Sequence, residues 1–364
     1  MRAAVLHAVD EPMKIEELEL EAPRAGEVSV RLLAAGVCHS DLHRARGDWG
    51  VPGLVVLGHE GAGVVEAVGE GVTSIARGQK AILNWNYPCL DCAACRQERQ
   101  WLCRGTRATE HLQPDGTTRL HRADGTDVLA YLTVGAFAEA TVVPAQAAIP
   151  VDGSVPPEVA CLIGCCVSTG VGAVVNTAEV SPGSSVAVVG LGGVGLSVLM
   201  GARLAGARTI VAVDKSEEKL QLARELGATD VVPAGEPRTT RAAIVAATDG
   251  GADFAFEAVG LRSTIELTLT SIGRGGTAVL VGLTALDTPI SFDGYRLVDL
   301  SQRILGSLYG SCNPSTDFPR FVDLYLAGEL PVDRLIEARI ALEDVNDALD
   351  ALERGIGRRR VITF

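Results

Sequence analysis

The sequence predicts an α/β protein with two domains, one rich in β-strands and one built from alternating strands and helices. Its 364 residues are enough for two domains. Residues 1 to about 80 carry strand patterns in which polar and apolar residues alternate. From residue 185 onward, nearly continuous apolar runs alternate with helical patterns, which is typical of a parallel sheet covered by helices.

The composition is that of a globular protein with an acidic surface. Hydrophobic residues make up 47% of the chain and charged residues 21%, and the formal net charge is -13. Nucleic acids and anionic membranes require a basic patch, and the basic run Arg358–Arg360 is too short to supply one. We therefore expect neither as a partner. The first residues carry no secretory pattern, so we expect a cytoplasmic protein whose nine cysteines are metal ligands and buried thiols.

Strand patterns recur through the β-rich part of the chain. Glu27–Leu32 alternates polar and apolar residues, and Gly61–Gly69 has glycines that permit close approach of two backbones. Arg77–Leu83 reads as a turn followed by a strand. A loop is expected from about 104 to 128, then a strand over Gly135–Val143 and a helix over 157–175.

Four cysteines lie close together in this part, in the pattern Cys89-x-x-Cys92-x-x-Cys95-x7-Cys103. Four thiolates can wrap one zinc ion in a closed tetrahedral site with no open coordination position. In a reducing compartment such a pattern indicates zinc rather than disulfides. The cluster therefore predicts a structural zinc site.

A second set of ligands is more widely spaced along the chain. It comprises Cys38 in Gly36-Val37-Cys38-His39-Ser40-Asp41, His59 in Gly58-His59-Glu60, and Cys165 in Gly164-Cys165-Cys166. Two thiolates and one imidazole supply three zinc ligands and leave the fourth position open, as a catalytic zinc requires. Thiolates favour zinc over magnesium or calcium. An ordinary histidine with two buried thiols is the alternative that spacing alone leaves open.

A glycine-rich turn marks the second domain. Gly190-Leu191-Gly192-Gly193-Val194-Gly195 follows directly after the apolar run Ser185–Val189, and a helix pattern continues to Ala207. In a dinucleotide-binding turn the first glycine allows the tight bend, the second lets the backbone approach the pyrophosphate, and the third lets the helix pack on the strand. The next apolar run, Thr209–Val213, ends in Asp214, which we expect to accept hydrogen bonds from the adenosine ribose. A carboxylate there disfavours a 2′-phosphate, so the pattern favours NAD over NADP.

Strands and helices continue to alternate beyond this turn. Glu217–Leu226 has a helical pattern, and Phe254–Val259 and Thr277–Gly282 read as further strands. Residues 315–327 and 343–353 have helical patterns. Residues 180–202 carry no charge, but their glycines indicate a buried strand, turn and helix rather than a membrane span.

Taken together, these motifs resemble the zinc-dependent medium-chain alcohol dehydrogenases nearly from end to end, including the closing Arg360–Phe364. The chain is most similar to the branch that holds the liver-type, aryl-alcohol and thiol-dependent formaldehyde dehydrogenases. The resemblance implies a GroES-like β-rich catalytic domain, formed by residues 1–166 and completed by 307–364. It implies a Rossmann NAD-binding domain with a doubly wound parallel sheet over 167–306. It also implies a homodimer, with a tetramer as the alternative.

The resemblance assigns roles around the metal. It implies that Cys38, His59 and Cys165 hold the catalytic zinc and that Cys89, Cys92, Cys95 and Cys103 hold the structural zinc. Asp41 would orient His59, and Glu60 would lie behind the metal. Ser40 would pass the alcohol proton toward His43, since histidine is the residue type most often used to relay protons to solvent.

Cofactor and substrate contacts follow by the same resemblance. The positions that match cofactor-binding residues are His39, Thr169, Gly190, Gly192, Gly193, Val194, Gly195, Asp214, Lys219, Val281, Leu283 and Arg360. The positions that match the substrate pocket are Trp49, Trp85, Leu283 and Tyr309. Two tryptophans in a pocket wall favour an apolar or aromatic substrate.

The predicted function is reversible hydride transfer between a primary, apolar or aromatic alcohol and NAD, with two zinc ions per chain. One alternative is a mycothiol-dependent formaldehyde dehydrogenase, since Ile82–Trp85 and Ser307–Gly310 are similar to segments of that group. Against it, Trp49 and Trp85 crowd the space that a large polar thiol carrier needs. The alternative of another class is a non-catalytic NAD-binding protein, which the complete set of zinc ligands disfavours.

Overall fold

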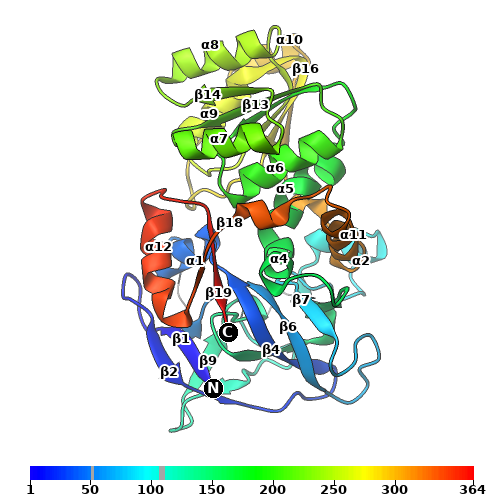
Figure 1. Cartoon of the computed structure of the whole chain (residues 1–364), viewed down its shortest axis with the longest axis vertical. Coiled ribbons are helices and arrows are strands. Elements are labelled where there is room, and N and C mark those ends of the chain that lie inside the picture. The colour runs from blue at the N-terminus through cyan, green and yellow to red at the C-terminus, as the bar shows by residue number, and fades with distance from the viewer. Residues whose placement is uncertain (51–52, 106–110) are drawn as a thin grey trace. The chain divides into compact units, whose positions relative to one another are not determined.

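A computed structural model describes residues 1–50, 53–105 and 111–364 of the chain. These residues form two compact units (Figure 1). Unit 1 comprises Met1–Cys165 and Asn313–Phe364 and so contains both ends of the chain, and unit 2 comprises Cys166–Cys312. The sequence placed the divisions at 166/167 and 306/307. The compact units divide at 165/166 and 312/313, which brings residues 307–312 into unit 2.

The described residues of unit 1 form two sheets. One has the strand order β2-β1-β5-β9-β8-β3, and the other has the order β11-β7-β6-β4-β19-β18, with β10 also paired to β4. The strands are β1 (Arg2–Leu6), β2 (Lys14–Glu17), β3 (Glu19–Leu20), β4 (Glu27–Gly36), β5 (Val55–Val56), β6 (Glu60–Val68), β7 (Lys80–Leu83), β8 (Leu120–His121), β9 (Asp127–Ala130), β10 (Ala140–Pro144), β11 (Ala148–Pro150), β18 (Ile336–Ile340) and β19 (Arg359–Thr363).

The described helices of unit 1 lie around these sheets and range in length from 4 to 13 residues. They are α1 (His39–Ala45), α2 (Ala93–Arg96), α4 (Pro157–Leu162), α11 (Pro314–Leu326) and α12 (Val345–Glu353), with 3-10 turns η1 (Gln100–Leu102), η2 (Tyr131–Thr133), η3 (Ala145–Ala147), η7 (Val332–Leu335) and η8 (Leu342–Asp344). The core of the unit gathers apolar side chains from both sheets, among them the fully buried Leu6, Leu32, Leu57 and Phe137. This packing fixes the strand ends that carry the predicted zinc ligands.

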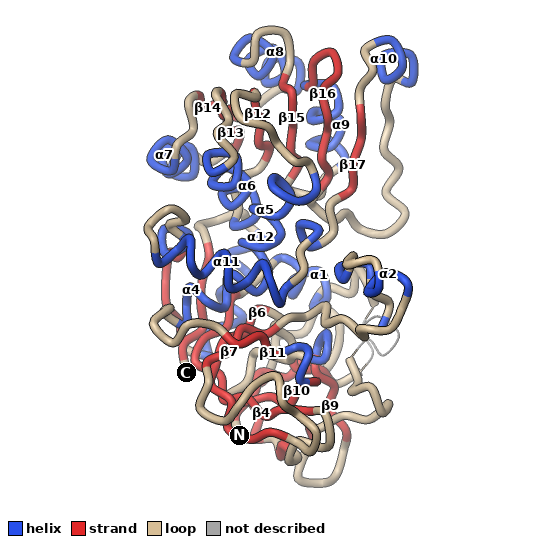
Figure 2. The backbone as a smooth tube through the Cα atoms, turned by 90° about the vertical axis from the view of Figure 1, so that its right-hand side faces the viewer, coloured by secondary structure: helices blue, strands red, loops and turns tan. Residues whose placement is uncertain are grey.

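Unit 2 is a single parallel sheet of six strands in the order β14-β13-β12-β15-β16-β17. Helices α6 and α7 pack together, and α8 and α9 pack together, so that the two pairs cover opposite faces of the sheet (Figure 2). Its strands are β12 (Ser185–Val189), β13 (Thr209–Asp214), β14 (Asp230–Pro233), β15 (Ala252–Glu257), β16 (Ile272–Leu280) and β17 (Arg303–Gly306). Its helices are α5 (Ser168–Gly172), α6 (Gly193–Leu204), α7 (Glu217–Leu226), α8 (Pro237–Ala247), α9 (Arg262–Ser271) and α10 (Gly294–Asp299), with the 3-10 turn η6 (Tyr309–Ser311) and the π-turn η5 (Ala173–Thr177).

Strand order reverses between β12 and β15, each of which hydrogen-bonds the other in parallel. In open parallel sheets, ligands bind at such a switch point, outside the carboxyl ends of the strands. The predicted doubly wound sheet is therefore confirmed, and the glycine-rich turn lies at its switch point.

Most expected elements are confirmed, and the differences have local causes. Helix α7 covers the expected range Glu217–Leu226. It begins after Ser216, whose side chain accepts from the Lys219 N–H, and ends at the left-handed Gly227. Helix α6 ends at Leu204 rather than Ala207, because Gly206 adopts a φ of 75°. The strand expected over Gly135–Val143 begins only at Ala140, since a turn with left-handed backbone precedes it.

The expected loop over 104–128 was only partly right. Among its described residues, Leu120–His121 and Asp127–Ala130 pair as the short strands β8 and β9. Residues 106–110 of that expectation lie outside the described residues. Strands of only two and four residues leave too little periodicity to be recognised from sequence.

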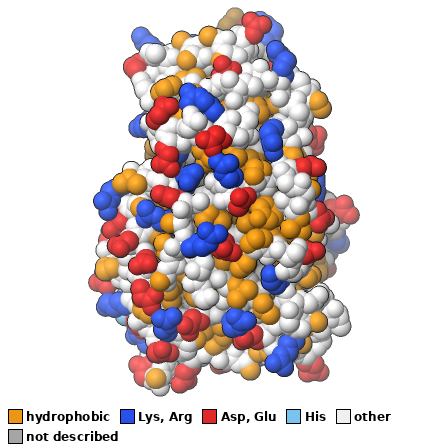
Figure 3. Space-filling model, viewed as in Figure 1, with side chains coloured by type: hydrophobic (Ala, Val, Ile, Leu, Met, Phe, Trp, Pro, Cys, Tyr) orange, Lys and Arg blue, Asp and Glu red, His pale blue; other side chains and the backbone are white. Residues whose placement is uncertain are grey.

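One helical stretch, Pro157–Thr177, is long and apolar enough to cross a membrane, but 83% of its apolar window is buried inside the protein. Residues 180–202 form the buried strand β12 and helix α6, as expected. Basic and acidic side chains are interspersed over the face drawn in Figure 3, which shows no continuous basic area.

Candidate metal and dinucleotide sites

The pairing of β4 with β6 brings the first two predicted zinc ligands together. The antiparallel register places Gly36 opposite Glu60, so that Cys38, just after β4, lies beside His59, just before β6. Gly58 makes this approach possible, because it has a φ of 85° and a Cβ there would meet the Phe137 ring at 2.5 Å. Glycine is therefore required at this position.

The third ligand arrives from a helix of the same unit. Cys165 lies in the π-turn η4 (Ile163–Val167), which follows α4 directly. The ligand atoms of Cys38, His59, Glu60 and Cys165 all lie within 4.8 Å of one another, and all four residues are buried. The Oε1 atom of Glu60 has no hydrogen-bond partner among the described residues. Two sulfurs and one ring nitrogen fit three positions of a tetrahedral zinc ion, and the unpartnered Glu60 oxygen lies beside them.

Asp41 forms hydrogen bonds that position two of the candidate ligands. Its Oδ1 atom accepts from the Gly58 N–H at 3.0 Å and lies 3.1 Å from His59 Nδ1, and its Oδ2 atom accepts from the Cys38 N–H at 3.1 Å. Because a carboxylate only accepts, the His59 proton is held on Nδ1 and Nε2 is left for a metal. One fully buried side chain thus positions two of the candidate ligands.

The surroundings of the site shift the pKa values of both Cys38 and His59. Hydrogen bonding to Cys165 and to His59 lowers the pKa of Cys38 well below its usual range, although burial opposes this. Burial alone would lower the pKa of His59, but the Asp41 carboxylate and the Cys38 sulfur raise it well above its usual value. Thiolate is the form of cysteine that binds metals, so the surroundings favour the ligand form of Cys38.

Glu60 is held by a buried ion pair with Arg359, which comes from the far end of the chain on β19. Burial raises the pKa of Glu60 to about 7, and Arg359 acts in the opposite direction. A Cβ on Gly36 would lie 2.1 Å from Glu60 Oε2, so glycine at 36 leaves room for the carboxylate. The sequence had singled out Glu60 but not Arg359. Two signals in the sequence could have pointed to Arg359. Glu60 is an acid expected to be buried beside the metal and so needs a basic partner, and the run Arg358–Arg360 offers one.

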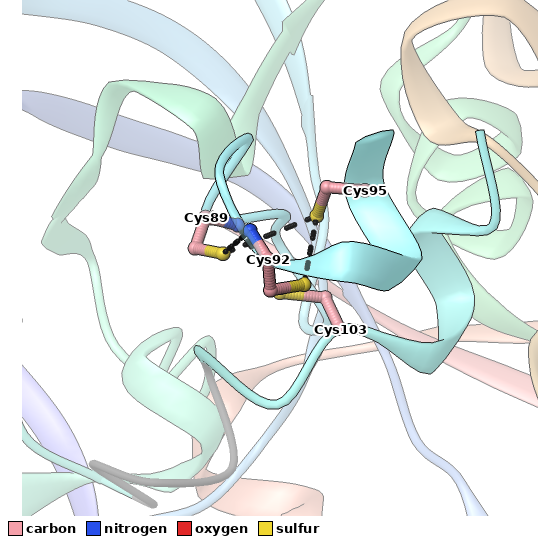
Figure 4. A group of neighbouring side chains, drawn as sticks. All are labelled: Cys89, Cys92, Cys95 and Cys103. Carbon is pink, nitrogen blue, oxygen red and sulfur yellow. Dashed lines mark hydrogen bonds between the residues drawn. The ribbon is translucent and has the colours of Figure 1, made fainter. Parts of the chain in front are cut away.

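The four clustered cysteines form the second candidate metal centre. Their sulfur atoms point toward one another from the loop that carries α2 and η1 (Figure 4). The sulfur–sulfur distances are 3.5 Å for Cys92–Cys95, 3.9 Å for Cys92–Cys103 and 4.0 Å for Cys89–Cys95. A tetrahedral zinc with Zn–S bonds of about 2.3 Å requires sulfurs about 3.8 Å apart. The geometry therefore fits a closed zinc site.

Backbone amides and burial act on these thiols in opposite directions. The Cys89 N–H and the Gly105 N–H both donate to Cys103 Sγ, at 3.2 and 3.3 Å. The Cys95 amide lowers the pKa of Cys92 to about 6, whereas burial raises the pKa of Cys95 to about 12. Four thiolates so close together repel one another unless a cation is present. Asn313 holds the loop that carries the four cysteines, because its side chain donates to Glu98 O and accepts from the Gln100 N–H.

The predicted relay residues lie on and after α1. Ser40 Oγ is 4.0 Å from Cys38 Sγ, and His43 is in the last turn of the helix. His43 Nδ1 lies 2.6 Å from Asp48 Oδ2, and the His43 ring stacks on Trp49 at a centroid distance of 4.7 Å. Sequence reasoning missed Asp48, which offered no signal beyond its proximity to His43 along the chain.

Two aromatic rings contact the ring of the candidate ligand His59. The ring of Trp85 is 6.3 Å from that of His59 and the ring of Tyr131 is 5.8 Å from it, both in T-shaped arrangements. Trp85 had been expected in the substrate pocket, while Tyr131 had not been considered. Tyr131 precedes two residues with left-handed backbone, Leu132 and Thr133, a conformation that the sequence did not indicate.

In unit 2 the three glycines of the fingerprint differ in their surroundings. Gly190 has a φ of 91°, and a Cβ there would meet Val259 at 2.3 Å. A Cβ on Gly195 would lie 1.7 Å from Gly190 O, so the helix packs closely against the turn. A Cβ on Gly192 would meet nothing within 4 Å, which leaves open space at the start of α6. The first N–H groups of α6 have no side-chain cap, and such a helix start suits a phosphate.

Asp214 stands at the end of β13, beside this turn. Its Oδ2 accepts from the Leu191 N–H at 2.7 Å, and its Oδ1 accepts from the Ser216 N–H at 2.9 Å. Each carboxylate oxygen can accept a second hydrogen bond. The side chain is therefore held in place by the turn while it can still accept from a ribose hydroxyl.

The other predicted contact residues are divided between the units. His39, Trp49, Trp85 and Arg360 belong to unit 1, and Thr169, Gly193, Val194, Lys219, Val281, Leu283 and Tyr309 belong to unit 2. Tyr309 is 2% exposed, while Leu283 is 57% exposed. Their roles in holding the cofactor and the substrate remain predictions.

Comparison with known proteins agrees with this geometry. Residues 24–153 match the alcohol dehydrogenase GroES-like domain, and residues 193–327 match the zinc-binding dehydrogenase domain. The chain is 37% identical to the alcohol dehydrogenase class-3 of Myxine glutinosa, over 99% of this chain and 97% of the relative.

Solved structures resemble the whole chain as well. An alcohol dehydrogenase zinc-binding domain protein from Burkholderia ambifaria is 38% identical with a TM-score of 0.95, covering 100% of this chain and 98% of that one. Benzyl alcohol dehydrogenase from Acinetobacter calcoaceticus is 32% identical with a TM-score of 0.90, covering 100% and 99%. The chain therefore belongs to the zinc-dependent medium-chain alcohol dehydrogenases and is an oxidoreductase.

Proposed function

We propose that this protein is an NAD-dependent alcohol dehydrogenase that interconverts a primary, apolar or aromatic alcohol and its aldehyde. The proposal rests on the buried cluster of ligand atoms from Cys38, His59 and Cys165. Ser40 Oγ lies 4.0 Å from Cys38 Sγ in this cluster. Three ligands with one open position are what a catalytic zinc needs. A zinc ion bound there supplies Lewis-acid chemistry that makes an alcohol hydroxyl more acidic.

The side chains of the site divide the remaining tasks. Asp41 fixes the His59 ring and the Cys38 backbone, so the two ligands keep one geometry. Ser40 is placed to receive the alcohol proton, and His43, whose side chain is 26% exposed, passes it on to solvent. A bound NAD would supply the nicotinamide that accepts a hydride.

We assign the coenzyme to unit 2 and the chemistry to unit 1. Support comes from the glycine-rich turn at the switch point of the parallel sheet and from the ligand set in unit 1. Asp214 favours NAD, because a 2′-phosphate next to its carboxylate would be repelled and would lose the ribose hydroxyl that the carboxylate can bind.

An apolar or aromatic substrate is supported by the rings near the metal site. Trp85 and Tyr131 both lie within 6.3 Å of the His59 ring, measured between centroids. Flat aromatic walls prefer aromatic partners in edge-to-face or offset-stacked contact. The benzyl alcohol dehydrogenase of Acinetobacter calcoaceticus, as a relative, is in line with this choice.

The test is a variant without one ligand, compared with a matched thiol. We expect Cys38→Ala to abolish oxidation of benzyl alcohol and to lose one zinc ion per chain, while NADH binding stays measurable. Cys161→Ala, which removes another buried cysteine from the same unit, should keep both zinc ions and most of the activity. Wild-type turnover in Cys38→Ala would rule out the proposed chemistry.

A substrate panel separates the alternatives. We expect benzyl and long-chain alcohols to be oxidised with NAD more efficiently than ethanol. Formaldehyde assayed with and without mycothiol tests the thiol-adduct reaction, because strict dependence on mycothiol would favour that alternative. An intact protein with both zinc ions, bound NADH and no turnover of any alcohol or adduct would favour the non-catalytic alternative.

We propose that the protein is a homodimer formed along the edge strand β17. This strand is the last of the parallel sheet, and the nearby segment exposes Phe292, Tyr295 and Val298. An unpaired strand edge with apolar side chains is suited to pair with a second copy. Light scattering should give twice the chain mass of 37.9 kDa, and a tetramer or monomer would contradict the dimer.

A further inference from the structure

His43 has a partner that the relay scheme did not include. Its Nδ1 atom lies 2.6 Å from Asp48 Oδ2, and Asp48 follows it by five residues on the turn after α1. An ionised carboxylate can only accept, so this contact requires the proton to be on Nδ1. In the neutral ring, the other nitrogen, Nε2, then carries a free lone pair and is the atom that can accept a proton.

The turn that carries Asp48 is held by several contacts. The Asp48 N–H donates to His43 O at 3.0 Å, and Gly47 allows the bend with a φ of 76°. Arg44 Nη1 donates to Trp49 O at 3.0 Å and to Gly50 O at 2.6 Å.

Arg44 is itself fixed inside the unit. It is 8% exposed, and its guanidinium lies 5.2 Å from the centroid of the Tyr131 ring. The Asp48 carboxylate is thus placed by a buried arginine rather than by a freely moving loop.

Trp49 constrains the same imidazole from its face. The two rings are nearly parallel, with an interplanar angle of 26° and a centroid separation of 4.7 Å. Stacking on the tryptophan face restricts rotation of the imidazole. Asp48 at the ring edge and Trp49 at its face together fix the orientation of His43.

We propose that Asp48 is a positioning residue for proton release, which acts through His43. Asp48 holds the proton on Nδ1, so that Nε2 accepts the proton released from the alcohol. The resulting imidazolium is stabilised by the Asp48 carboxylate, and Nε2 then gives the same proton to solvent. The ring returns to its starting tautomer, with one proton taken and one released. This inference rests on the proposed function, because it needs His43 to carry the proton.

A plain surface ion pair would have different consequences. Exposed pairs contribute little, and their loss leaves turnover unchanged. A carboxylate that fixes a histidine tautomer changes the proton-transfer step and has no effect when the histidine is absent. The two roles are therefore separable by a double-mutant cycle.

The experiment compares wild type, Asp48→Asn, His43→Gln and the double variant in single-turnover oxidation of benzyl alcohol by NAD. Single turnovers are used because product release sets the steady-state rate of many enzymes. We expect Asp48→Asn to slow the reaction about tenfold, with KM for the alcohol and NADH affinity little changed, since a positioned acid or base contributes at least that much. In the His43→Gln background the same change should have almost no effect.

A matched control removes an equally exposed carboxylate near the same helix. Glu353 forms an ion pair with Arg46, just after α1, rather than with His43. Glu353→Gln should therefore react at the wild-type rate. An equal loss in both backgrounds of the cycle, or a wild-type rate in Asp48→Asn while His43→Gln is slow, would overturn the role of Asp48. A wild-type rate in His43→Gln would instead overturn the relay itself.

A second measurement needs neither turnover nor a variant at Asp48. Nitrogen NMR of the imidazole signals, with His43 identified by its loss in His43→Gln, reports which nitrogen is protonated. We expect the Nδ1–H tautomer of the neutral ring. An Nε2–H tautomer would contradict the proposal, even if Asp48→Asn failed to fold.

Discussion

Replacing Asp41 by asparagine tests how much of the zinc affinity depends on the hydrogen bonds beneath the ligands. In the structure the carboxylate accepts from the Cys38 and Gly58 amides and from His59 Nδ1, all at 3.0–3.1 Å and with no exposure to solvent. An asparagine oxygen can replace Oδ1, but its NH2 group then faces the Cys38 N–H, and two donors meet. One hydrogen bond and the negative charge are lost.

The expected size follows from that loss. A hydrogen bond to a charged group is worth about 2 kcal/mol, which is about 30-fold in zinc affinity at 1.4 kcal/mol per tenfold. This lies within the 10–100-fold range usual for residues that orient metal ligands. We therefore expect Asp41→Asn to bind the zinc of the Cys38 site about 30-fold more weakly and to leave the four-cysteine site unchanged.

Dialysis against graded concentrations of a chelator, followed by elemental analysis, measures both sites. Wild type should hold two zinc ions per chain, and the variant should fall to one at a chelator concentration that wild type tolerates. Glu27→Gln is the matched control, because Glu27 is also a buried acid of unit 1, but it pairs with Arg119 far from the ligands. If Asp41→Asn kept both ions as tightly as wild type, the role we assign to Asp41 would be wrong.

Three further outcomes are expected. Cys92→Ser should lose one zinc ion and melt at a lower temperature, because three thiolates cannot close a tetrahedral site, whereas loss of alcohol oxidation at low temperature before any loss of folding would contradict a structural role. His111 is buried, and burial lowers its pKa from 6.5 to about 4, so the unfolded chain binds the extra proton as pH falls through this range. Stability should therefore rise with pH between about 4 and 6.5, by at most about 3 kcal/mol from this group, and chemical denaturation of His111→Gln should show a smaller rise. Asp214→Asn should reduce the preference for NAD over NADP in kcat/KM by about tenfold, since the repulsive charge is removed, and an unchanged ratio would refute that role.

Much of this protein could be predicted from local sequence. The caps Ser216 and Gly227 define α7, and the glycines at 190, 192 and 195 predict the turn at the switch point of the parallel sheet. The four clustered cysteines lie within one loop, so their spacing alone limits how far apart the sulfurs can be. In each case the residues that interact are close in the chain, and short-range geometry determines the outcome.

The three ligands proposed for the catalytic zinc could be predicted only in part from the sequence. Residue types and the family resemblance suggested Cys38, His59 and Cys165, but only the register of β4 against β6 and the π-turn after α4 bring their ligand atoms within 4.8 Å. The strands β8 and β9 were missed because they have only two and four residues, too few to show a periodic pattern.

The sequence by itself determined the fold class, the dinucleotide turn and the four-cysteine motif, because these features depend on residue types and local spacing. Only the tertiary structure decided which charges meet. Glu60 is joined to Arg359 across 299 positions of the chain, and the side chain of Arg44 shapes the turn that sets Asp48 against His43. Such contacts depend on how whole strands and helices pack, and no local pattern records them.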